Sequence, residues 1–500
     1  MPVSILIAIF LAFELEEIRG ISTSFGFGEA GRIGVVAASI AAVAAVSFAV
    51  GRFVAWRVDR GGYGSERLRR AYAIAGRVVA ILVLLSYASI LYVANWRSIV
   101  EVDFGLRGAF FLDEFLILLP YLIAQFTAWW GLYAAERSLR LASTRISDRG
   151  GLFVYLSLKA RQSLALALPI VLIFLLGEDL GDRFAPNLDR SPWLQLGLIG
   201  LIGSTVLITA PAFVRLSLPA SPLPDGPLRR RLETLMRRCG FRCSNILIWR
   251  TGHSLVNAGV TGIWSRFRYV LLTDALVDRL DEHQVEAVFG HEIGHIARRH
   301  FFLFSFFFIG SGAIISLAAL GAHGLLTTVP GGRLASAFNG VAAGFNGVEA
   351  IETGLVIVAA IVYLIVGFGH VSRRFEREAD VYGCRAVSCG SDDCPPHLDV
   401  NAGSGAIGVA ERICPVGLRT FATALAEVAE LNGIDRDARS WRHGGIGKRI
   451  AFLESLENRP QVQDRYARGS RRFRVVFATA LVAAVAAAVA TGALAKALTF

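Results

Sequence analysis

The sequence predicts a mainly α-helical, multi-pass membrane protein, with about eight to nine membrane helices and a small α+β unit that is split around two of them. The chain of 500 residues is 54% hydrophobic and only 18% charged. Its mean hydropathy of +0.53 lies far from the balance of a soluble domain. Apolar runs long enough to cross a bilayer recur along the chain, and a stretch of alternating helix and strand patterns interrupts them.

The apolar runs predict the membrane helices in order. A helix needs about 20 apolar residues to cross a bilayer, and runs of this kind occur at 33–51, 78–96, 115–135, 193–214, 301–323, 353–369 and 475–495. Two weaker runs lie at 2–13 and 162–177. The run at 2–13 has neither a basic segment before it nor a small-residue cleavage site after it. We therefore expect a short or partly inserted helix there and no signal peptide.

Arginine is unevenly distributed between the connecting segments. Arginine-rich segments alternate with loops that are mixed, acidic or nearly uncharged: 52–77, 137–161 and 215–300 against 97–107, 178–190 and 324–352. The positive-inside rule places the arginine-rich side in the cytoplasm. Arginines at a membrane surface also explain the net charge of +11. No stripe of base-stacking aromatic residues accompanies them, so we expect no nucleic-acid partner.

Proline and glycine separate the first membrane bundle from the rest of the chain. The stretch SLPASPLPDGP, which ends at Pro227, interrupts any helix. Beyond it, LRRRLETLMRRCGF has leucines at helical spacing, and NILIWR and YVLLTDAL predict strands. We expect three regions: a membrane helix bundle at 1–216, an α+β domain at 217–460 that includes the membrane helices near 301–323 and 353–369, and a membrane anchor at 461–500.

The stretch HEIGH is the first indication of chemistry. His291 and His295 are four residues apart on a predicted helix, so both side chains lie on one face and can reach a single ion. Glu292 is offset around the helix axis, as expected of a general base that does not itself bind the metal. A chance match is the alternative, because the motif alone has false positives.

A third metal ligand is needed, because catalytic zinc sites use three protein ligands and leave the fourth position for water. The sequence offers Glu376 in GHVSRRFEREADVYG, after the next two membrane runs. Asp380 lies one helical turn further on, where it can hydrogen-bond a ligand histidine and fix its tautomer. The alternative for this stretch is a solvated helix of alternating charges.

The chain contains HEIGH, then two membrane runs, then SRRFEREAD. In this order the motifs resemble the membrane zinc metalloendopeptidase family of the gluzincin type that contains HtpX and the type I CaaX prenyl proteases. The resemblance covers roughly residues 220–460 and includes Asn257 and Ala258 ahead of the zinc helix. It also includes HGGIGKRIAFL, with His443 and Arg449 in the matching places. The α+β unit is therefore expected to be zincin-like and to form a peptidase domain.

The resemblance implies a zinc-dependent endopeptidase with one catalytic Zn2+ bound by His291, His295 and Glu376. Bound zinc lowers the pKa of water to near neutrality. Glu292 would take the proton of the attacking water and later protonate the leaving amine. Substrates are expected to be membrane proteins or membrane-tethered peptides, because the zinc helix adjoins a membrane run.

Four further site residues follow from the resemblance. His443 is the candidate donor to the tetrahedral intermediate, and Arg449 would brace the site. Asn257 and Ala258 lie at an edge strand to which an extended peptide substrate could add. Gly444 stands where the family pattern has proline, so the turn that carries His443 is expected to differ.

Four of the six cysteines lie in an apparent insertion at 384–417, namely Cys384, Cys389, Cys394 and Cys414, with His397 nearby. Their spacing differs from the usual C-x2-C of a structural metal site. A cytoplasmic location argues against disulfides. Unpaired thiols are therefore favoured over disulfides, and disulfides over a second, structural metal ion.

Two other classes of function stay open at this stage. Arg77, Asp113 and Glu114 at membrane depth would suit a transporter, although their places near helix ends favour snorkelling. A zinc-binding membrane scaffold without catalysis is the second alternative. His300 and His370 are interpreted as polar residues at the ends of membrane runs.

We expect an integral membrane protein in a bacterial inner membrane, with its catalytic unit in the cytoplasm. The alanine- and arginine-rich composition favours the bacterial assignment. The partners are then the lipid bilayer and protein or peptide substrates. The sequence does not separate the processing of prenylated peptides from membrane-protein quality control, and it does not fix the oligomeric state.

Overall fold

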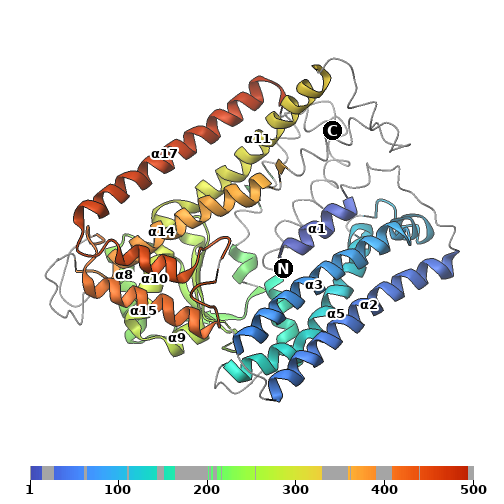
Figure 1. Ribbon diagram of the computed structural model, residues 1–500, viewed down its shortest axis with the longest axis horizontal. Helices are drawn as coiled ribbons and strands as arrows, with labels where there is room; N and C mark the ends of the chain where they lie inside the picture. Colours follow the sequence, from blue (N-terminus) through green and yellow to red (C-terminus); the bar gives the residue numbers. More distant parts are fainter. Residues whose placement is uncertain are drawn as a thin grey trace. The chain divides into compact units, whose positions relative to one another are not determined.

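Long apolar helices appear where the apolar runs predict them. The computed structural model of the protein (Figure 1) describes residues 2–13, 28–60, 65–109, 112–143, 151–163, 201, 204–205, 211–215, 217–253, 255–328, 359–360, 362–389, 408–438 and 440–493. Within these residues, five helices are long and apolar enough to cross a membrane: Ala30–Asp59, Ala71–Tyr92, Leu112–Leu139, His300–Gly321 and Pro460–Ala490. They match five predicted runs. The runs at 162–177 and 193–214 lie largely outside the described residues, and the run at 353–369 is described only in part.

The chain divides into two compact units. One comprises Met1–Ser221 with the short segments Trp249–Leu255 and Thr261–Ile263, and the other contains the remaining residues to Phe500. The first unit is helical. Its described elements up to residue 143 are α1 (Pro2–Phe13), α2 (Glu29–Asp59), α3 (Ser65–Tyr92), the short α4 (Trp96–Ser98) and η3 (Ile99–Asp103), and α5 (Leu112–Ser143).

Small residues bring α2 and α5 into close contact. A Cβ atom at Gly51 would lie 1.9 Å from the carbonyl oxygen of Gly131, and one at Gly131 would lie 2.5 Å from the Ser47 hydroxyl. Such glycine contacts are typical of packed membrane helices. Nearby, the buried Tyr87 on α3 donates a hydrogen bond to the Ile117 carbonyl on α5.

The second unit contains most residues of a four-stranded sheet, whose strands are in the order β1-β2-β4-β3. The predicted strand NILIWR is confirmed as β2, and YVLLT of the predicted strand YVLLTDAL forms β4, whereas its last three residues begin a helix. β3 forms one edge of the sheet. The strands and the helices that accompany them are β1 (Ala220–Pro222), α8 (Pro227–Arg238), β2 (Asn245–Trp249), β3 (Ala258–Thr261), β4 (Tyr269–Thr273), α9 (Asp274–Arg279) and α10 (Glu282–Ala297).

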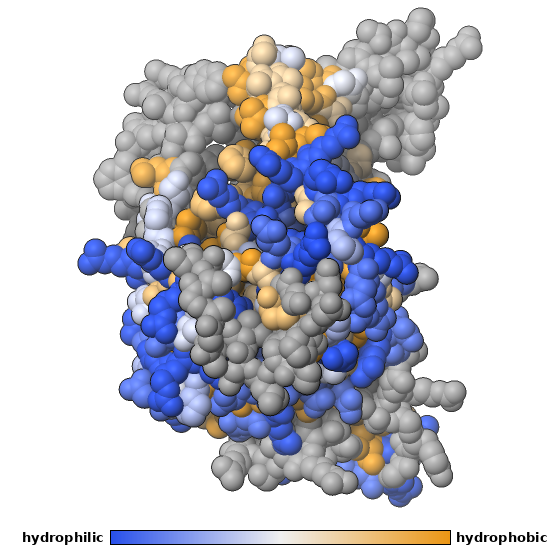
Figure 2. Space-filling view, turned by 90° about the vertical axis from the view of Figure 1, so that its left-hand side faces the viewer, coloured by the Kyte–Doolittle hydropathy of each residue, from blue (hydrophilic) through white to orange (hydrophobic). Residues whose placement is uncertain are grey.

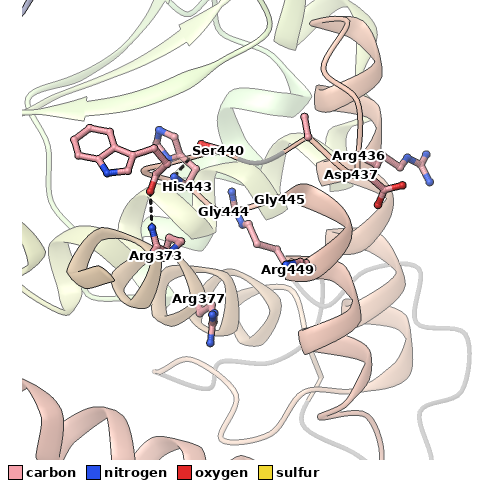
Figure 3. A pocket seen from close by; sticks show the side chains of 12 residues that line it. Arg373, Arg377, Arg436, Asp437, Ser440, His443, Gly444, Gly445 and Arg449 are labelled. Atoms are coloured by element: carbon pink, nitrogen blue, oxygen red, sulfur yellow. Dashed lines mark hydrogen bonds between the residues drawn. The ribbon is translucent and has the colours of Figure 1, made fainter. Parts of the chain in front are cut away.

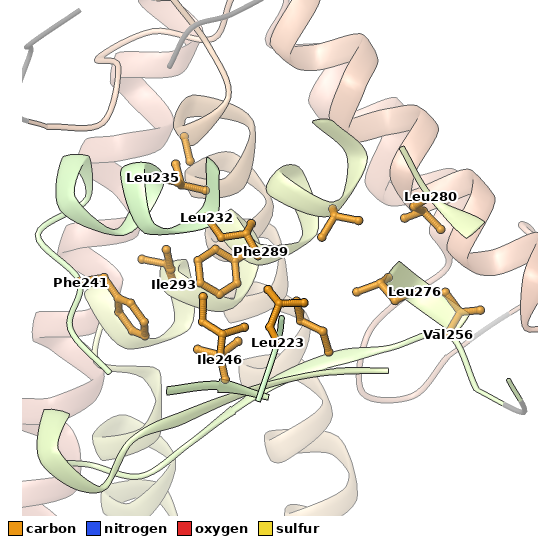
Figure 4. Packing of buried hydrophobic residues seen from close by; sticks show 14 of the residues in the cluster. Leu223, Leu232, Leu235, Phe241, Ile246, Val256, Leu276, Leu280, Phe289 and Ile293 are labelled. Atoms are coloured by element: carbon orange, nitrogen blue, oxygen red, sulfur yellow. The ribbon is translucent and has the colours of Figure 1, made fainter. Parts of the chain in front are cut away.

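The core of this unit lies between the sheet and the helices α8 and α10 (Figure 4). Leu232 and Leu235 of α8 meet Phe289 and Ile293 of α10 above Ile246 of β2, and all five are nearly or fully buried. Leucines at helical spacing in an otherwise arginine-rich segment produce this packing, because only one face of α8 is apolar.

The remaining helices of this unit include two of the candidate membrane spans, α11 (His300–Thr328) and α17 (Pro460–Ala490). The others are the π-helical η6 (Leu364–Phe368), α14 (Gly369–Ala386), α15 (Pro415–Leu431) and α16 (Ile446–Glu454). Helices α11 and α17 run side by side (Figure 1), and Gly310 of α11 lies against Leu481 of α17. Helix α10 ends at Ala297, and Arg299, with a left-handed φ of 58°, turns the chain into α11.

Helix α14 lies directly on α10 because three glycines face the contact. A Cβ atom would lie 2.9 Å from the Ala386 Cβ atom at Gly290 and 3.0 Å from the Tyr382 Cβ atom at Gly294. At Gly383 of α14 it would lie 2.5 Å from the Phe421 ring and 2.9 Å from the backbone nitrogen of His291. The two helix backbones therefore approach closely at the level of HEIGH.

We predict that Gly383→Ala destabilises the protein, because the added methyl group meets the α10 backbone, which cannot move like a flexible side chain. Overpacking of this kind costs about 1–3 kcal/mol. The matched control is Gly469→Ala on α17, where a Cβ atom would meet nothing within 4 Å. That change should be neutral or stabilise by up to about 1 kcal/mol. Thermal unfolding in detergent measures both, and equal midpoints for the two variants would contradict the close approach.

Candidate active site

Helix α10 directs its two histidines away from the hydrophobic core. Asp281 caps the start of the helix: its carboxylate accepts from the Gln284 backbone N–H, and the Gln284 side chain accepts from the Asp281 N–H. The face that contains Phe289 is fully buried in the core. His291 and His295 fall between these apolar positions, so they project from a different face.

The side chains of His291, His295 and Glu376 converge. Their ligand atoms all lie within 4.8 Å of one another. The two Nε2 atoms are 3.2 Å apart, and each is 3.8 Å from an oxygen of the Glu376 carboxylate. Two imidazole nitrogens and one carboxylate are a usual donor set for catalytic zinc.

The outer nitrogens of both histidines have partners of their own. His291 Nδ1 lies 2.9 Å from an oxygen of Asp380. His295 Nδ1 lies 3.0 Å from His300 Nδ1, and His300 Nε2 lies 3.3 Å from an oxygen of Glu378. His300 and Glu378 are both buried.

These contacts determine the ring protons. A carboxylate only accepts, so His291 carries a proton on Nδ1 opposite Asp380, and His300 carries one on Nε2 opposite Glu378. A neutral His300 then accepts at Nδ1, which puts the Nδ1 proton on His295. Both Nε2 atoms are left with lone pairs that face each other across 3.2 Å. Positive charge between the rings, from a cation or from a second proton, removes this repulsion.

The electrostatics agree with a site for positive charge. Burial and the nearby His291 lower the pKa of His295 to about 3, so His295 is a poor carrier of that charge. Burial also disfavours charge on His291, but the hydrogen bond and charge of Asp380 outweigh it and raise the pKa of His291. The three converging groups therefore fit a metal ion.

Arg449 of α16 contacts two of the three acidic residues of α14, Asp380 and Glu376. Its guanidinium donates to both oxygens of Asp380, at 2.8 and 2.5 Å. A third nitrogen lies 3.4 Å from Glu376. Arg449 is buried, so this bidentate pair is screened little by water. Burial alone would raise the pKa of Asp380, yet the charge of Arg449 keeps it below its usual value.

His443 reaches the same carboxylate from a loop. Its Nδ1 lies 2.9 Å from Glu376, and its side chain is half exposed. Burial would raise the pKa of Glu376, but hydrogen bonding by His443 and the charge of Arg449 hold it well below the usual range. The following Gly444 has a φ of 76°, which proline cannot adopt. The turn therefore differs from one that has proline at this place.

A cavity of about 440 Å3 lies beside His443 and Arg449. Figure 3 shows Arg373 and Arg377 on α14 along one wall and His443 on the opposite loop. Arg373 donates to the backbone carbonyl of Trp441 and thereby ties this loop to α14. The cavity offers space for a ligand beside His443 and Arg449, both of which contact Glu376.

Glu292 follows His291 on α10 and is half-buried. Burial raises the pKa of its carboxyl group to about 7, although the nearby His291 acts in the opposite direction. A carboxyl group with a pKa near 7 is suited to general acid–base catalysis at neutral pH.

Sequence reasoning missed His300 and Glu378. His300 was interpreted as an interfacial residue, but it is 1% exposed and stacks on Phe375 with ring centroids 4.4 Å apart. Glu378 also contacts Arg298 and Arg474. Little in the sequence indicated that Glu378 belongs to the site. It lies two residues after Glu376, and residues two apart on a helix normally point in different directions.

Asn257 and Ala258 lie at the sheet edge. Asn257 pairs with β4 through Thr273, whose backbone N–H donates to the Asn257 carbonyl, and Ala258 begins β3. β3 has no further strand on its outer side among the described residues.

The cysteines do not assemble into a second site within the described residues. Cys384 and Cys414 are buried and Cys389 is exposed, and no disulfide forms among the five described cysteines. Cys394 and His397 lie outside the described residues. Burial raises the pKa of the Cys384 thiol well above its ordinary value.

Comparisons with known proteins agree on one family. Residues 222–398 match the model of peptidase family M48. CAAX prenyl protease 1 of Saccharomyces cerevisiae is 29% identical over 137 residues, which are 26% of this chain and 28% of that protein. A CAAX prenyl protease 1 homologue of Arabidopsis thaliana is 27% identical over 215 residues, which are 41% of this chain and 46% of that protein.

A solved structure extends the likeness to the fold. The crystal structure of S. mikatae Ste24p aligns with a TM-score of 0.51 over 84% of this chain and 98% of that chain, at 15% sequence identity. The sequence matches span only 27% to 46% of the length of the curated relatives.

The fold and the site define a multi-pass membrane protein with a metallopeptidase-like centre. Within this class, residues 222–398 match the model of peptidase family M48, in agreement with the resemblance carried by the motifs HEIGH and SRRFEREAD. The five apolar helices and the fold shared with Ste24p support an integral membrane protein.

We predict that Asp380→Asn is strongly destabilising, because it removes the carboxylate that accepts both hydrogen bonds of the buried Arg449 and leaves only the 3.4 Å contact to Glu376. Breaking a buried pair in this way costs about 3–5 kcal/mol. Asp437→Asn, at an exposed position in the wall of the cavity, is the control and should change stability by less than about 0.5 kcal/mol. Denaturant or thermal unfolding in detergent measures the difference. A double variant Asp380→Asn/Arg449→Met that is as unstable as the sum of the single changes would show that the two groups are not coupled.

Proposed function

We propose that this protein is a zinc-dependent membrane metalloendopeptidase. The observation that carries the proposal is the convergence of His291 Nε2, His295 Nε2 and the Glu376 carboxylate, whose ligand atoms lie within 4.8 Å of one another. The family match at residues 222–398 supports the same reading, because M48 metallopeptidases are in general zinc-dependent. One catalytic Zn2+ is proposed, held by these three residues with a fourth position left for water.

Bound zinc would polarise the scissile carbonyl and lower the pKa of water to near neutrality. Glu292 would accept a proton from the attacking water and donate it to the leaving nitrogen. Its pKa of about 7 allows both transfers near neutral pH. Glu292 would therefore be the general base when water attacks and the general acid when the amine leaves.

His443 and Arg449 would act around the third ligand. Asp380 and Arg449 hold Glu376 and His291 in place through the buried pair and its 3.4 Å contact to Glu376. His443 orients Glu376 from the open side, and in its doubly protonated form it would also donate to the oxyanion of the tetrahedral intermediate.

The edge strand β3 would bind the substrate. An extended peptide can add to its outer side by main-chain hydrogen bonds, with Asn257 and Ala258 at the point of addition. This mode recognises backbone more than side chains, so we propose broad sequence specificity. Membrane proteins or membrane-tethered peptides are the proposed substrates, because α11 enters an apolar span directly after the HEIGH helix. We place the catalytic unit in the cytoplasm of a bacterium, from the arginine distribution and the composition.

No described contact favours the transport alternative. Asp113, at the start of α5, accepts from the Gly108 backbone N–H, and Arg77 donates to the Ala73 carbonyl of its own helix. The Asp113 contact fits the start of a helix, and the long Arg77 side chain can snorkel along its own helix. Uptake that survives Glu292→Gln would still favour transport.

We predict that Glu292→Gln retains one zinc per chain and loses at least about 100-fold in the cleavage of an unfolded casein substrate, because the general base is absent. Glu282→Gln, in the first turn of the same helix, is the matched control and should keep its activity. Metal analysis and cleavage assays in detergent test both variants. A protein without zinc, or unchanged cleavage by Glu292→Gln, would rule out this mechanism.

We predict that His300→Ala weakens zinc binding by about 10- to 100-fold, the usual effect of removing an outer partner of a ligand histidine. His300→Asn should restore part of this loss, because its side-chain oxygen can still accept from His295 Nδ1. Competition with a chelator measures zinc affinity without reference to activity. If His300→Ala and wild type release zinc at the same chelator concentration, His300 does not orient His295.

A further inference from the structure

A second cavity, of about 350 Å3, lies next to the one beside His443. Its lining comes from α14, α16 and α17: His370, Arg373, Arg374, Arg377, Phe452 and Tyr466. Arg373 and Arg377 line both cavities. The second cavity therefore has a wall of cationic side chains and a wall of aromatic rings, and no acidic residue among its lining.

The arginines of this cavity are held in place without being neutralised. The Arg374 guanidinium lies 4.2 Å from the centre of the Phe473 ring, and that of Arg377 lies 5.7 Å from the centre of Phe452. Arg373 donates to the Trp441 carbonyl at 2.8 Å. Within the described residues, no carboxylate forms an ion pair with any of the three. Burial and the charges of these arginines lower the pKa of His370, which agrees with an uncompensated positive field.

The cavity lies where the protein surface changes from polar to apolar. On α17, arginines recur up to Arg474, and the following Val475 and Val476 begin an exposed apolar stretch. Trp441 donates its indole N–H to the Ile365 carbonyl of η6, and Tyr466 lines the cavity. Figure 2 shows hydrophobic residues at the top of this face giving way to hydrophilic residues below. Tryptophan and tyrosine commonly lie at such membrane interfaces.

We propose that this cavity binds the phosphate group of an anionic membrane lipid. Arginine forks match phosphate oxygens in a bidentate manner, and basic pockets between membrane helices on the cytoplasmic side suit lipid head groups. Phe452 and Tyr466 would contact the glycerol and the first methylenes of the lipid. A free phosphate ion offers the same charge but leaves these rings without a partner.

The test uses full-length protein in detergent, with phosphatidylglycerol or phosphatidylcholine added and the retained lipid counted after washing. We expect wild type to retain phosphatidylglycerol in preference to phosphatidylcholine. Arg374→Gln/Arg377→Gln should lower the affinity for phosphatidylglycerol by roughly 10- to 30-fold, as removal of two interfacial charges implies. Arg230→Gln/Arg237→Gln on α8 removes the same charge from exposed positions outside the cavity and should retain lipid as wild type does.

Three outcomes would overturn the proposal. The first is equal retention of both lipids by wild type, and the second is unchanged retention of phosphatidylglycerol by Arg374→Gln/Arg377→Gln. The third is displacement of the lipid by inorganic phosphate at about the concentration of the lipid itself, which would assign the cavity to a soluble anion. If the glutamine pair unfolds early on heating, Arg374→Lys/Arg377→Lys replaces it. That pair keeps the charge without the fork and should bind with intermediate affinity. Lipid retention is counted in the Glu292→Gln background, so its result is independent of the proposed peptidase activity.

Discussion

The close approach of α10 and α14 is the constraint on which the site depends. Gly290 and Gly294 on one helix and Gly383 on the other leave no room for a Cβ atom between the backbones. At a larger separation the carboxylates of α14 could not reach the imidazoles of α10. Because Glu376 and Asp380 are one turn apart, the same contact delivers one carboxylate to the inner nitrogens and the other to an outer nitrogen.

The charges around this contact favour additional positive charge between the two imidazoles. Glu376 and Asp380 are buried carboxylates, and Arg449 offsets one of them. Asp380 requires the ring proton of His291 on Nδ1. Glu378 requires the ring proton of His300 on Nε2, so His300 accepts from His295 Nδ1. The lone pairs that remain point toward a common centre, which makes the tautomers of His291 and His295 a consequence of their outer partners and not of the metal itself.

The i, i+4 spacing of the sequence was sufficient to place each pair of site residues on one helix face, and the family resemblance, rather than spacing, joined the two pairs into one site. His291 with His295 and Glu376 with Asp380 are both i, i+4 pairs, and a helix puts such pairs on one face. His300 could not be found in this way. It reaches His295 only because Arg299 adopts a left-handed φ of 58° and turns the chain between two helices. The conformation of Gly444 and the shared arginine wall of the two cavities likewise depend on tertiary contacts that no local pattern encodes.

Packing at the level of the membrane continues into the outer contacts of the site. Phe375 stacks on His300 on one side. On its other sides it meets Phe304 of α11 and Phe477 of α17, both within the helices that are apolar enough to cross a membrane. Because His300 in turn contacts His295, the orientation of this imidazole depends on the packing of α11 against α17 as well as on α10. The site therefore depends on the apolar helices α11 and α17 as well as on the α+β unit. This gives a physical reason why its two motifs flank membrane segments.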